Sequence, residues 1–448
     1  MVSVDSNTVR ADFIVNGKLV PIDNFTTYSL ESDFFVACDS FHLTIEDDRA
    51  EQLNKQIQVG SPIVISVDNH AQLAGYVDKI TLSYSRGGGS TLSISGRDYL
   101  GAMSDATCNP NLKYTSQQTI KSILEDLFDI FALTPTISNA AQLTVATGGY
   151  VGTATHSKSA KGAAKSWARK INRQIKPAKE EGYLEYAMRL SKEVGLNIKM
   201  MPGTTFVSVN TPTYDRDTGP DFFLTNKAAN DVFVDKATNN IIDGSMSADW
   251  QKQPSCIISE LAGGSSNPTY RRDIPKIIQV NEIVAFKTDV QHEDVGIKDK
   301  WITHLQDDIK SIIIDGLGPD SKLEPLNGGL MFSLPTLLQN QPYVGNVCRP
   351  MFSFDSEGSS AEELEFFAMS KMAKHQNEFL NLEYTVKDHK NNGKIWNVDT
   401  MTVINDTRLQ VFGIFWLQKR IFSKSRSGGT ITKLQFRLPY VYNFYATE

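Results

Sequence analysis

The stretch SYSRGGGSTLSIS at residues 83–95 is typical of a β-hairpin, because a glycine-rich turn separates two segments of alternating residues. A similar stretch, SKSRSGGTITKLQ, occupies residues 423–435. The spacing between the two is constant, and the identical residues that align are Lys79, Ser83, Ser85, Arg86, Gly88 and Gly89 with Lys419, Ser423, Ser425, Arg426, Gly428 and Gly429. We predict that the chain makes one hairpin twice, with turn glycines that adopt positive φ.

Strand patterns surround both copies of this hairpin. Near the N-terminus, Asn16 and Gly17 lie between two apolar runs, which is a strong hairpin signal, and apolar residues then alternate as far as Ile94. Residues 382–438 alternate again and contain a second Asn-Gly turn at Gly393. We therefore predict two related small antiparallel β-barrels, one toward each end of the chain.

The residues between these two blocks favour mixed structure. Apolar residues recur at helical spacing in 120–131 and 184–194, and Gly195 stands where a helix C-cap belongs. Residues 289–346 are rich in glycine and proline, which indicates an irregular insertion. The predicted fold class is α+β, mainly β, with two related β-barrels, an α/β middle segment and an inserted irregular region.

These patterns divide the chain into predicted domains. The first barrel takes residues 1–106, and an α/β helix-hairpin domain takes residues 107–215 and includes a basic helix at 158–176. The second barrel combines residues 216–290 with 376–448. Residues 291–375 hold the insertion and a further helix. A chain of 448 residues is too long for one hydrophobic core, which agrees with several domains.

The predicted basic helix carries lysines and arginines but no acidic residue. Its alanine-rich apolar stripe is typical of a helix whose solvated face covers a core, and this is the simplest interpretation. Docking onto an acidic partner surface is a sharper alternative, and nucleic-acid binding is another. The net charge of −6 argues against a chain whose whole surface binds nucleic acid.

Composition places the chain among ordinary globular proteins, with 40% hydrophobic and 21% charged residues. Its first residues lack a signal-peptide pattern, and no apolar run is long enough for a membrane span, so we predict no membrane anchor. The cysteines are Cys38, Cys108, Cys256 and Cys348, and none forms a CxxC pair. We predict buried thiols in a protein made in a reducing cytosol.

Catalytic spacings are absent from the sequence. It contains no GxSxG, no HExxH, and no GxGxxG at a strand–helix junction, and no two histidines lie four residues apart. Arg97 and Asp98 have a simple structural interpretation, in which Asp98 caps a short helix and Arg97 forms a surface ion pair. We predict a protein that is not an enzyme and needs no cofactor or metal ion.

In their order, these segments resemble the baseplate hub proteins of phage Mu-type tails, a family that also occurs in tailocins. Residues 75–78 (GYVD) and 92–98 (LSISGRD) are similar to strands of that family's opening barrel. Residues 182–209 resemble its helix and β-hairpin, and residues 391–439 resemble the closing strands of its second barrel. The residues that carry the resemblance are Gly75, Asp78, Gly96, Arg97, Asp98, Gly195, Gly393, Trp396, Gly429 and Thr430.

The resemblance implies a homotrimer whose chains each hold two similar barrels, so that six barrels form a ring. Such a ring joins a sixfold tail tube to a threefold central spike and forms part of the tail channel. The implied partners are the tail tube protein, the central spike protein, the tape-measure protein and other baseplate proteins. The implied location is the baseplate of the virion tail, assembled in the host cytoplasm. The candidate interface residues are Arg86, Arg426, Lys161, Lys165, Arg169 and Arg173.

Two alternative functions stay open at this point. The first is a nucleic-acid-binding protein that acts through the basic helix at residues 158–176, and the second is a cell-wall hydrolase of the tail tip. Neither the basic helix nor the insertion at 289–346 has a counterpart in the resemblance. Whether the tail contracts is also left open by the sequence.

Overall fold

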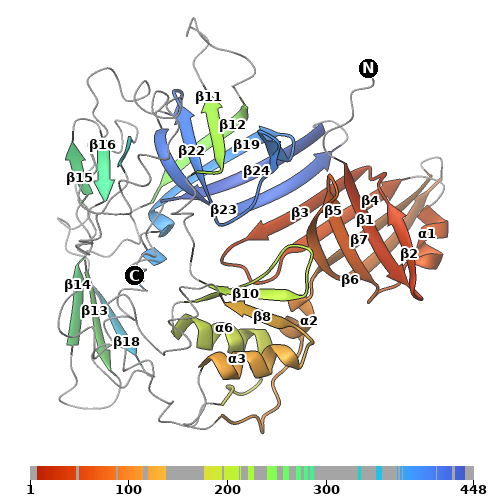
Figure 1. The fold of residues 1–448 in the computed structure, drawn as a ribbon, viewed down its shortest axis with the longest axis horizontal. Coiled ribbons are helices and arrows are strands. Elements are labelled where there is room, and N and C mark those ends of the chain that lie inside the picture. Colours follow the sequence, from red (N-terminus) through yellow and green to blue (C-terminus); the bar gives the residue numbers. More distant parts are fainter. Residues whose placement is uncertain are drawn as a thin grey trace, which may run out of the picture.

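A computed structural model describes residues 8–46, 50–86, 89–114, 120–137, 176–193, 196–210, 212, 220–226, 240–249, 256–261, 269–273, 277–280, 283–286, 331–333, 350–355, 371, 374–375, 377–409, 411–425 and 429–438. Strands predominate in these ranges, and a few helices accompany them (Figure 1). The prediction of an α+β fold that is mainly β is therefore confirmed.

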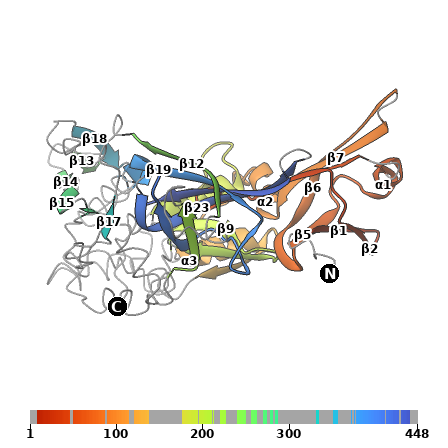
Figure 2. The same cartoon turned by 90° about the horizontal axis from the view of Figure 1, so that it is seen from above.

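One large sheet runs through the described part of the molecule. The strands of its main path are β1 (Val9–Val15), β2 (Lys18–Ile22), β3 (Thr27–Asp33), β4 (Ser40–Glu46), β5 (Pro62–Val67), β6 (His70–Ser85), β7 (Gly89–Asp98), β12 (Ile241–Ala248), β19 (Leu380–Lys387), β23 (Val411–Ser425) and β24 (Gly429–Arg437). Their order in space is β12-β19-β24-β23-β3-β4-β7-β6-β5-β1-β2. Figure 2 shows β12 and β19 toward one end of this sheet and β6 and β7 toward the other.

Further strands join the large sheet beside this path. They are β11 (Phe222–Asn226), β15 (Ile277–Val280), β16 (Ile283–Phe286), β17 (Met331–Ser333) and β22 (Thr400–Asp406). The strand β22 pairs with β23 on one edge and with β11 on the other. The helix α1 (Ala50–Gln56) lies beside β6 and β7 at the other end of the sheet. Residues from the first and last thirds of the chain thus belong to one hydrogen-bonded layer.

Asparagine and glycine form the tight turns that the sequence predicts. Asn16 and Gly17 both have positive φ and connect β1 to β2. Asn392 and Gly393 also have positive φ, and they connect β20 (Lys390–Asn391) to β21 (Lys394–Ile395). Positive φ at both central residues gives a turn whose twist matches the twist of paired strands. Both predicted Asn-Gly hairpins are confirmed.

The middle segment packs helices against a small sheet of its own. Its elements are α2 (Leu100–Asp105), α3 (Ile120–Asp129), β8 (Thr134–Ile137), α6 (Tyr183–Glu193), β9 (Asn197–Met200) and β10 (Phe206–Asn210). The strand β10 lies between β8, which is parallel to it, and β9, which is antiparallel. Ile123, Leu127 and Leu190 are buried in the core between these helices and the sheet. The helices predicted from apolar spacing in this segment are confirmed.

Another small sheet combines residues that are far apart in the sequence. Its strands are β13 (Cys256–Leu261), β14 (Thr269–Asp273) and β18 (Pro350–Asp355). The strand β13 pairs antiparallel with β14 and parallel with β18. Because β18 lies within residues 291–375, strand pairing connects this predicted domain to residues 256–261. Apart from β17, β18 and residues 371 and 374–375, that domain lies outside the described residues.

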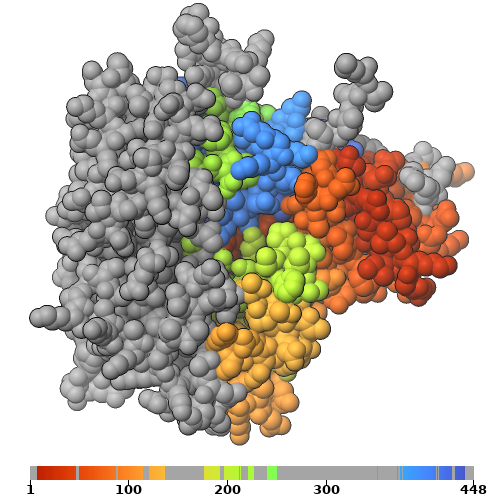
Figure 3. Space-filling view, viewed as in Figure 1, coloured from red at the N-terminus to blue at the C-terminus, as the bar shows by residue number. Residues whose placement is uncertain are grey.

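A single apolar core lies under both strand-rich blocks. Phe13 and Ile94 from the first block belong to the same buried cluster as Phe222 and Phe436 from the second. In Figure 3 the blue C-terminal strands lie directly against the orange and red N-terminal block. No closed barrel is seen among the described residues, because the edge of β3 that faces away from β4 pairs with β23. The prediction of two separate small barrels is therefore not confirmed.

Two glycines allow β6 and β7 to approach closely. A Cβ atom on Gly96 would lie 2.0 Å from the carbonyl oxygen of Tyr76, and one on Gly75 would lie 2.0 Å from that of Arg97. Both distances are far inside van der Waals contact, and both obstacles are backbone atoms that cannot rotate away. Packing against the neighbouring strand therefore requires glycine at these two positions.

We predict that Gly96→Ala lowers the free energy of unfolding by about 2 kcal/mol, because the added methyl group forces the two strands apart. Urea denaturation followed by circular dichroism measures this change. The matched control is Gly182→Ala, whose new Cβ atom would have its nearest neighbour at 3.4 Å. Equal stabilities for the two variants would contradict the steric argument.

Candidate functional site in a duplicated hairpin and two sheet edges

The hairpins β6–β7 and β23–β24 pair in the same register. Both contain a β-bulge at the same place, at Asp78 in the first hairpin and Gln418 in the second. Gly89 and Gly429, which begin β7 and β24, both have positive φ. The corresponding pairs are Tyr76↔Arg97 with Trp416↔Arg437, Lys79↔Ser95 with Lys419↔Gln435, and Ser85↔Gly89 with Ser425↔Gly429. The duplication predicted from the sequence is thus confirmed.

The duplication extends to a side-chain contact at the bulge. In the first hairpin, the Nε atom of Arg97 donates a hydrogen bond to Oδ2 of Asp78 at 2.7 Å. In the second, the Nε atom of Arg437 donates to Oε1 of Gln418 at 3.1 Å. A bulge turns one extra side chain out of the ladder, and here the same arginine atom holds that side chain in both copies. Sequence comparison missed Arg437 because its neighbours differ from those of Arg97.

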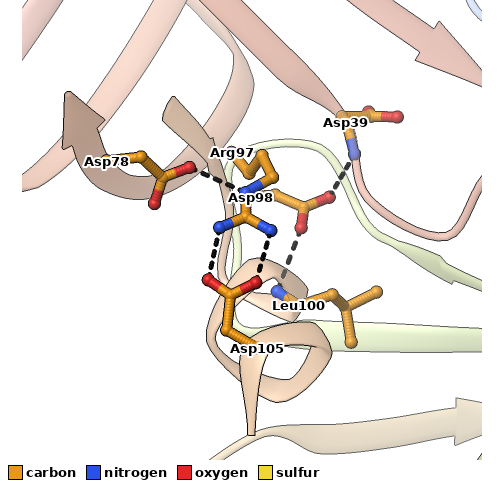
Figure 4. A network of polar contacts seen from close by, with 6 residues as sticks. All are labelled: Asp39, Asp78, Arg97, Asp98, Leu100 and Asp105. Carbon is orange, nitrogen blue, oxygen red and sulfur yellow. Dashed lines mark hydrogen bonds and ion pairs between the residues drawn. The ribbon is translucent and has the colours of Figure 1, made fainter. Parts of the chain in front are cut away.

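A polar network around Arg97 connects the first hairpin to α2 (Figure 4). The two terminal nitrogens of Arg97 donate to the two carboxylate oxygens of Asp105 at 2.9 and 2.6 Å. The carboxylate of Asp98 accepts from the backbone N–H of Asp39 at 2.7 Å and from that of Leu100 at 3.0 Å. The predicted ion pair of Arg97 is confirmed. The N-cap residue of α2 is Tyr99 rather than Asp98, although the Asp98 carboxylate accepts a hydrogen bond from the first N–H group of the helix.

Asp98 lies deeper than a simple surface cap. Its side chain is buried, and burial is the main cause that raises its pKa well above the ordinary range. The nearby charge of Asp39 raises the pKa further, whereas the two backbone donors lower it. The two hydrogen bonds hold the loop before β4 against the start of α2, so Asp98 connects the sheet to the middle segment.

The two blocks meet where β23 pairs with β3. The antiparallel register is Lys419↔Asp33, Arg420↔Ser32, Ile421↔Glu31, Phe422↔Leu30, Ser423↔Ser29 and Lys424↔Tyr28. Phe422 and Leu30 are buried in the shared core. Just beyond β3, the rings of Phe34 and Phe35 pack edge-on against Trp416, with centroids 5.2 and 5.7 Å apart. Backbone pairing and apolar packing therefore both hold this junction.

A buried arginine crosses the junction. Arg420 is only 3% exposed, and its Nη1 atom donates to Oε1 of Gln72 in β6 at 2.7 Å and to Oδ1 of Asn397 at 3.1 Å. It also donates to the carbonyl oxygen of Trp396, and its guanidinium lies 4.3 Å from the ring centroid of Phe422. Burial lowers its pKa to about 10, so Arg420 stays charged at neutral pH. Of its acceptors, Gln72 belongs to the first block, so this hydrogen bond forms only when the two blocks are joined.

A chain of hydrogen bonds through His389 lies beside the arginine. The hydroxyl of Thr432 donates to the carbonyl oxygen of Asp388 at 2.5 Å, so its oxygen accepts the bond of 2.9 Å from Nδ1 of His389. The Nε2 atom of His389 is then unprotonated and accepts from the hydroxyl of Tyr28 at 2.8 Å. Burial, together with the charge of Arg420, lowers the pKa of His389 to about 3. The imidazole is therefore neutral and connects β3 to β24.

The edge of β6 that corresponds to this junction has no strand partner among the described residues. On one edge, β23 pairs with β22 along its first half and with β3 along its second half. On the equivalent edge, β6 pairs with β5 along its first half. Its second half, residues 79–85, pairs only with β7 in the described structure. Leu82 and Tyr84 on this segment are 38% and 86% exposed.

A second open edge lies at the far end of the sheet. The strand β12 pairs with β19 on one side, and no described strand pairs with its other side. The order β12-β19-β24-β23 repeats the order β3-β4-β7-β6, so β12 stands in the second unit where β3 stands in the first. Ile242 of β12 is 59% exposed. One described chain therefore presents two four-stranded units in tandem, with an open edge at each end.

Of the other residues named from the sequence, some are described by the structure and the rest lie outside the described residues. Arg86 is exposed at the tip of the first hairpin, and Thr430 lies next to the tip of the second. Trp396 is buried, with its ring centroid 4.3 Å from that of Phe222. Cys38 and Cys108 are free thiols, the first half-buried and the second buried. The following lie outside the described residues: Gly195, Arg426, Lys161, Lys165, Arg169, Arg173 and all of the predicted basic helix except Lys176.

Two further features are absent from the described residues. No group of three or more His, Cys, Asp and Glu side chains among them is arranged to hold a metal ion. No helix in the described ranges is both long enough and apolar enough to cross a membrane.

Comparison with known families identifies the first block. Residues 11–98 match the family model described as Mu phage baseplate assembly protein GpP-like, N-terminal. This range runs from β1 to the end of β7 and contains Gly75, Gly96 and Arg97. The resemblance to Mu-type baseplate proteins that the sequence predicts is therefore confirmed. A search of curated proteins found no match to the chain.

Solved structures share the fold over nearly the whole chain. A tail protein from Neisseria meningitidis is 16% identical with a TM-score of 0.64, and the match covers 98% of this chain and 99% of that one. A 43 kDa tail protein of prophage MuSo2 from Shewanella oneidensis is 14% identical with a TM-score of 0.60, covering 97% and 99%. A prophage tail protein from Listeria monocytogenes is 8% identical with a TM-score of 0.50, covering 96% and 94%. At these identities the likeness concerns the fold.

We predict that Asp98→Ala lowers the free energy of unfolding by about 2 kcal/mol, because two buried backbone N–H groups lose their acceptor. The matched control is Asp105→Ala, which removes an exposed partner of Arg97 and should cost less than 1 kcal/mol. Chemical denaturation of both variants measures the difference. A larger loss for Asp105→Ala would contradict the assignment of Asp98 as the connection between the sheet and α2.

We predict a pH dependence of stability that His389 causes. Its pKa in the folded protein is about 3, below the ordinary value of about 6.5, so only the unfolded chain takes up a proton as the pH falls below 6.5. Stability is full above pH 6.5 and decreases toward pH 3 by about 1 kcal/mol per pH unit. Denaturation at pH 7, 6 and 5 measures this slope.

Two substitutions separate His389 from other titrating groups. His389→Gln should flatten the slope between pH 6 and pH 5, because no imidazole remains to be protonated in the unfolded chain. His70→Gln changes an exposed histidine and should leave the slope as it is in the unmodified protein. Equal slopes in the unmodified protein and in His389→Gln would contradict the prediction.

Proposed function

We propose that this chain is the structural baseplate hub of a phage or phage-like tail. In this proposal it is a homotrimer that joins the sixfold tail tube to the threefold central spike and forms part of the tail channel. The observation that carries the proposal is the tandem pair of four-stranded units, with matching hairpins, bulges and arginine contacts, in one chain. The family match of residues 11–98 to a baseplate assembly protein supports it.

The duplication has a direct consequence for symmetry. Three chains with two similar units each present six similar surfaces around one axis, which is the repeat number of a sixfold tube. Parts that occur once in each chain, such as the α3–α6 segment, are then present three times and suit a trimeric spike. A closed ring of this kind needs interfaces that join unlike surfaces head to tail. The function is thus interface complementarity, with no catalytic step in the proposal.

The proposal extends to partners and location. The tail tube protein contacts the sixfold face, the central spike protein contacts the threefold face, and the tape-measure protein lies in the channel. Other baseplate proteins surround the ring, and the assembled hub is part of the virion tail after assembly in the host cytoplasm. The exposed hairpin tip with Arg86 is the proposed contact with the tube, and Arg426 takes the same role in the second copy. The basic helix at residues 158–176 is a further candidate contact.

The first test of this function is the mass and symmetry of the purified chain, alone and with its candidate tube and spike proteins. We expect a trimer by native mass spectrometry and a threefold ring with six similar lobes in class-averaged electron micrographs. Monomers that persist when both partners are present would contradict the proposal. A nucleic-acid complex with a steep salt dependence, or a cleared zone in a cell-wall zymogram, would favour the alternative functions instead.

A charge-reversal pair tests the proposed tube contact. Arg86→Glu with Arg426→Glu should reduce co-sedimentation with tail tubes at least tenfold and leave the trimer intact, because charged tips contribute to docking rather than to folding. The matched control reverses two exposed lysines that lie outside both hairpins and outside α1, Lys18→Glu with Lys113→Glu. Equal co-sedimentation of the two double variants would exclude the tips from the tube contact.

A further inference from the structure

We infer that the outer half of β6 binds β12 of a second copy of this chain, in the register in which β23 binds β3 within one chain. The inference deepens the proposed hub and rests on its self-association, but it goes further by naming both surfaces and their residue pairs. The strand registers of the described residues make the two units equivalent strand by strand.

The equivalence of the outer strands follows from the register of each neighbour. Because the two hairpins correspond, Gly96 in β7 is equivalent to Phe436 in β24. Phe41 of β4 pairs with Gly96, and Leu382 of β19 pairs with Phe436, so Phe41 and Leu382 are equivalent. The same relation holds along the rest of these strands. Therefore β4 and β19 occupy the same position in their units.

The registers of β3 and β12 with their neighbours show that these two strands are also equivalent. Leu30 of β3 pairs with Phe41, and Met246 of β12 pairs with Leu382. Leu30 and Met246 are therefore equivalent, and both are apolar residues that contact the shared core. By the same alignment, Ser245 is equivalent to Ser29. The strand β12 is thus the counterpart of β3, although its sequence alone does not reveal this.

The junction within the chain now predicts the junction between chains. Replacing β23 by β6 and β3 by β12 in the observed register gives a complete set of pairs. These pairs, with the partner copy second, are Lys79↔Asp249, Ile80↔Ala248, Thr81↔Ser247, Leu82↔Met246, Ser83↔Ser245 and Tyr84↔Gly244. The pairing of Ser83 with Ser245 repeats the observed pairing of Ser423 with Ser29, and that of Lys79 with Asp249 repeats Lys419 with Asp33. The two ends therefore match in residue chemistry as well as in register.

Equivalent side chains in the two hairpins differ in exposure, as expected if the edge of β6 pairs with a strand of another chain. Phe422, which is paired with Leu30 of β3, is fully buried, whereas its equivalent Leu82 is 38% exposed. Trp416 is also fully buried under Phe34 and Phe35, and its equivalent Tyr76 is 38% exposed. An open strand edge with exposed apolar side chains is a template for another strand. A second copy of β12 is the occupant whose register the chain itself already demonstrates.

A second copy is required because the two edges cannot meet within one chain. The strands β12 and β6 lie toward opposite ends of the same continuous sheet (Figure 2). Pairing β6 of one copy with β12 of the next joins unlike surfaces, and each added copy leaves one open edge again. Such a head-to-tail contact closes into a ring when the rotation per copy permits it. Closure removes every open edge of this kind.

Disulfide formation between copies tests the register directly. In a chain that carries Ser83→Cys and Ser245→Cys, mild oxidation should give reducible multimers that end at the covalent trimer. Mixing the two single variants should give covalent dimers only. The positive control is Ser29→Cys with Ser423→Cys, whose positions pair within one chain and should give a disulfide without a change in mass. The register control is Ser83→Cys with Ser247→Cys, and the unmodified chain measures the background from its own cysteines.

A charged side chain introduced at the open edge of β6 tests the inference independently. Leu82→Lys should weaken self-association at least tenfold by analytical ultracentrifugation, because a lysine would be buried against Met246 of the next copy. Leu19→Lys is the matched control, because Leu19 is also an exposed apolar residue but lies on β2 at the end of the sheet path. The circular dichroism spectra of both variants should match that of the unmodified chain, because neither substitution changes a buried core residue.

The outcomes separate this inference from the proposed function. A trimer by mass in which only the positive control forms its disulfide would overturn the strand pairing and leave the hub proposal intact. Cross-linked multimers larger than a trimer would support the pairing and contradict a closed trimer. Preferential cross-linking of Ser83→Cys with Ser247→Cys would overturn the register. Monomers at every concentration, with and without tube and spike proteins, would overturn both proposals.

Discussion

The antiparallel pairing of β3 with β23 is the interaction on which the rest of the described structure depends. A strand edge exposes N–H and C=O groups that need partners, and no described strand of the second block pairs with the outer half of β23. Using β3 for this purpose merges the two blocks into one sheet with one apolar core. It also leaves the equivalent edge of β6 without a strand inside the described chain. The fold thus satisfies one of its two equivalent edges internally.

Buried polar groups give this junction a single register. Arg420 finds its acceptors only when Gln72 of the first block and Asn397 of the second lie on either side of it. His389 must likewise face Tyr28 from β3 and Thr432 from β24. A slip of one residue would turn each of these side chains to the other face of the sheet and leave buried groups unpaired. Apolar contacts such as Phe422 with Leu30 tolerate more variation, so the polar groups define which pairing is correct.

Local patterns in the sequence predicted the local parts of the fold, and the non-local parts needed the structure. Asn16-Gly17 and the hairpin glycines act within a few residues, so their turns follow from composition and spacing. The repeat of the hairpin was also visible, because identical residues stand at a constant spacing. The partner of the outer edge of β23 is set by contacts between residues 28–33 and 419–424. The alternation of apolar and polar residues along β23 would be the same with any partner strand, so the sequence pattern does not identify the partner. The prediction of two separate barrels was not confirmed, because the pairing of β3 with β23 joins the two blocks.

The same difference between local and non-local information applies to the residues of the candidate site. Arg97 and Asp98 were recognisable because they stand side by side before a helix, whereas Arg437 stands in the sequence without a similar neighbour. Arg437 lies at the same constant spacing from Arg97 as the other repeated hairpin residues, and the bulge contact with Gln418 shows what role the two arginines share. The role of β12 is still further from local pattern, because nothing in its sequence except a serine and a following aspartate repeats β3. Register in a sheet is a relation between strands, and so the structure had to supply it.

Divergence between the two copies is as important to the proposed function as their likeness. Asp98 connects the first hairpin to α2 and the middle segment, and its equivalent in the second hairpin is the buried apolar residue Leu438. The first copy therefore holds a folded α/β segment that the second copy does not hold in the same way. In a ring of three chains, the hairpins and their arginine contacts recur at every unit, and the segment behind Asp98 recurs at every second unit. In the proposed ring, the exchange of a buried aspartate for leucine at equivalent positions is therefore one difference that distinguishes the two units of each chain.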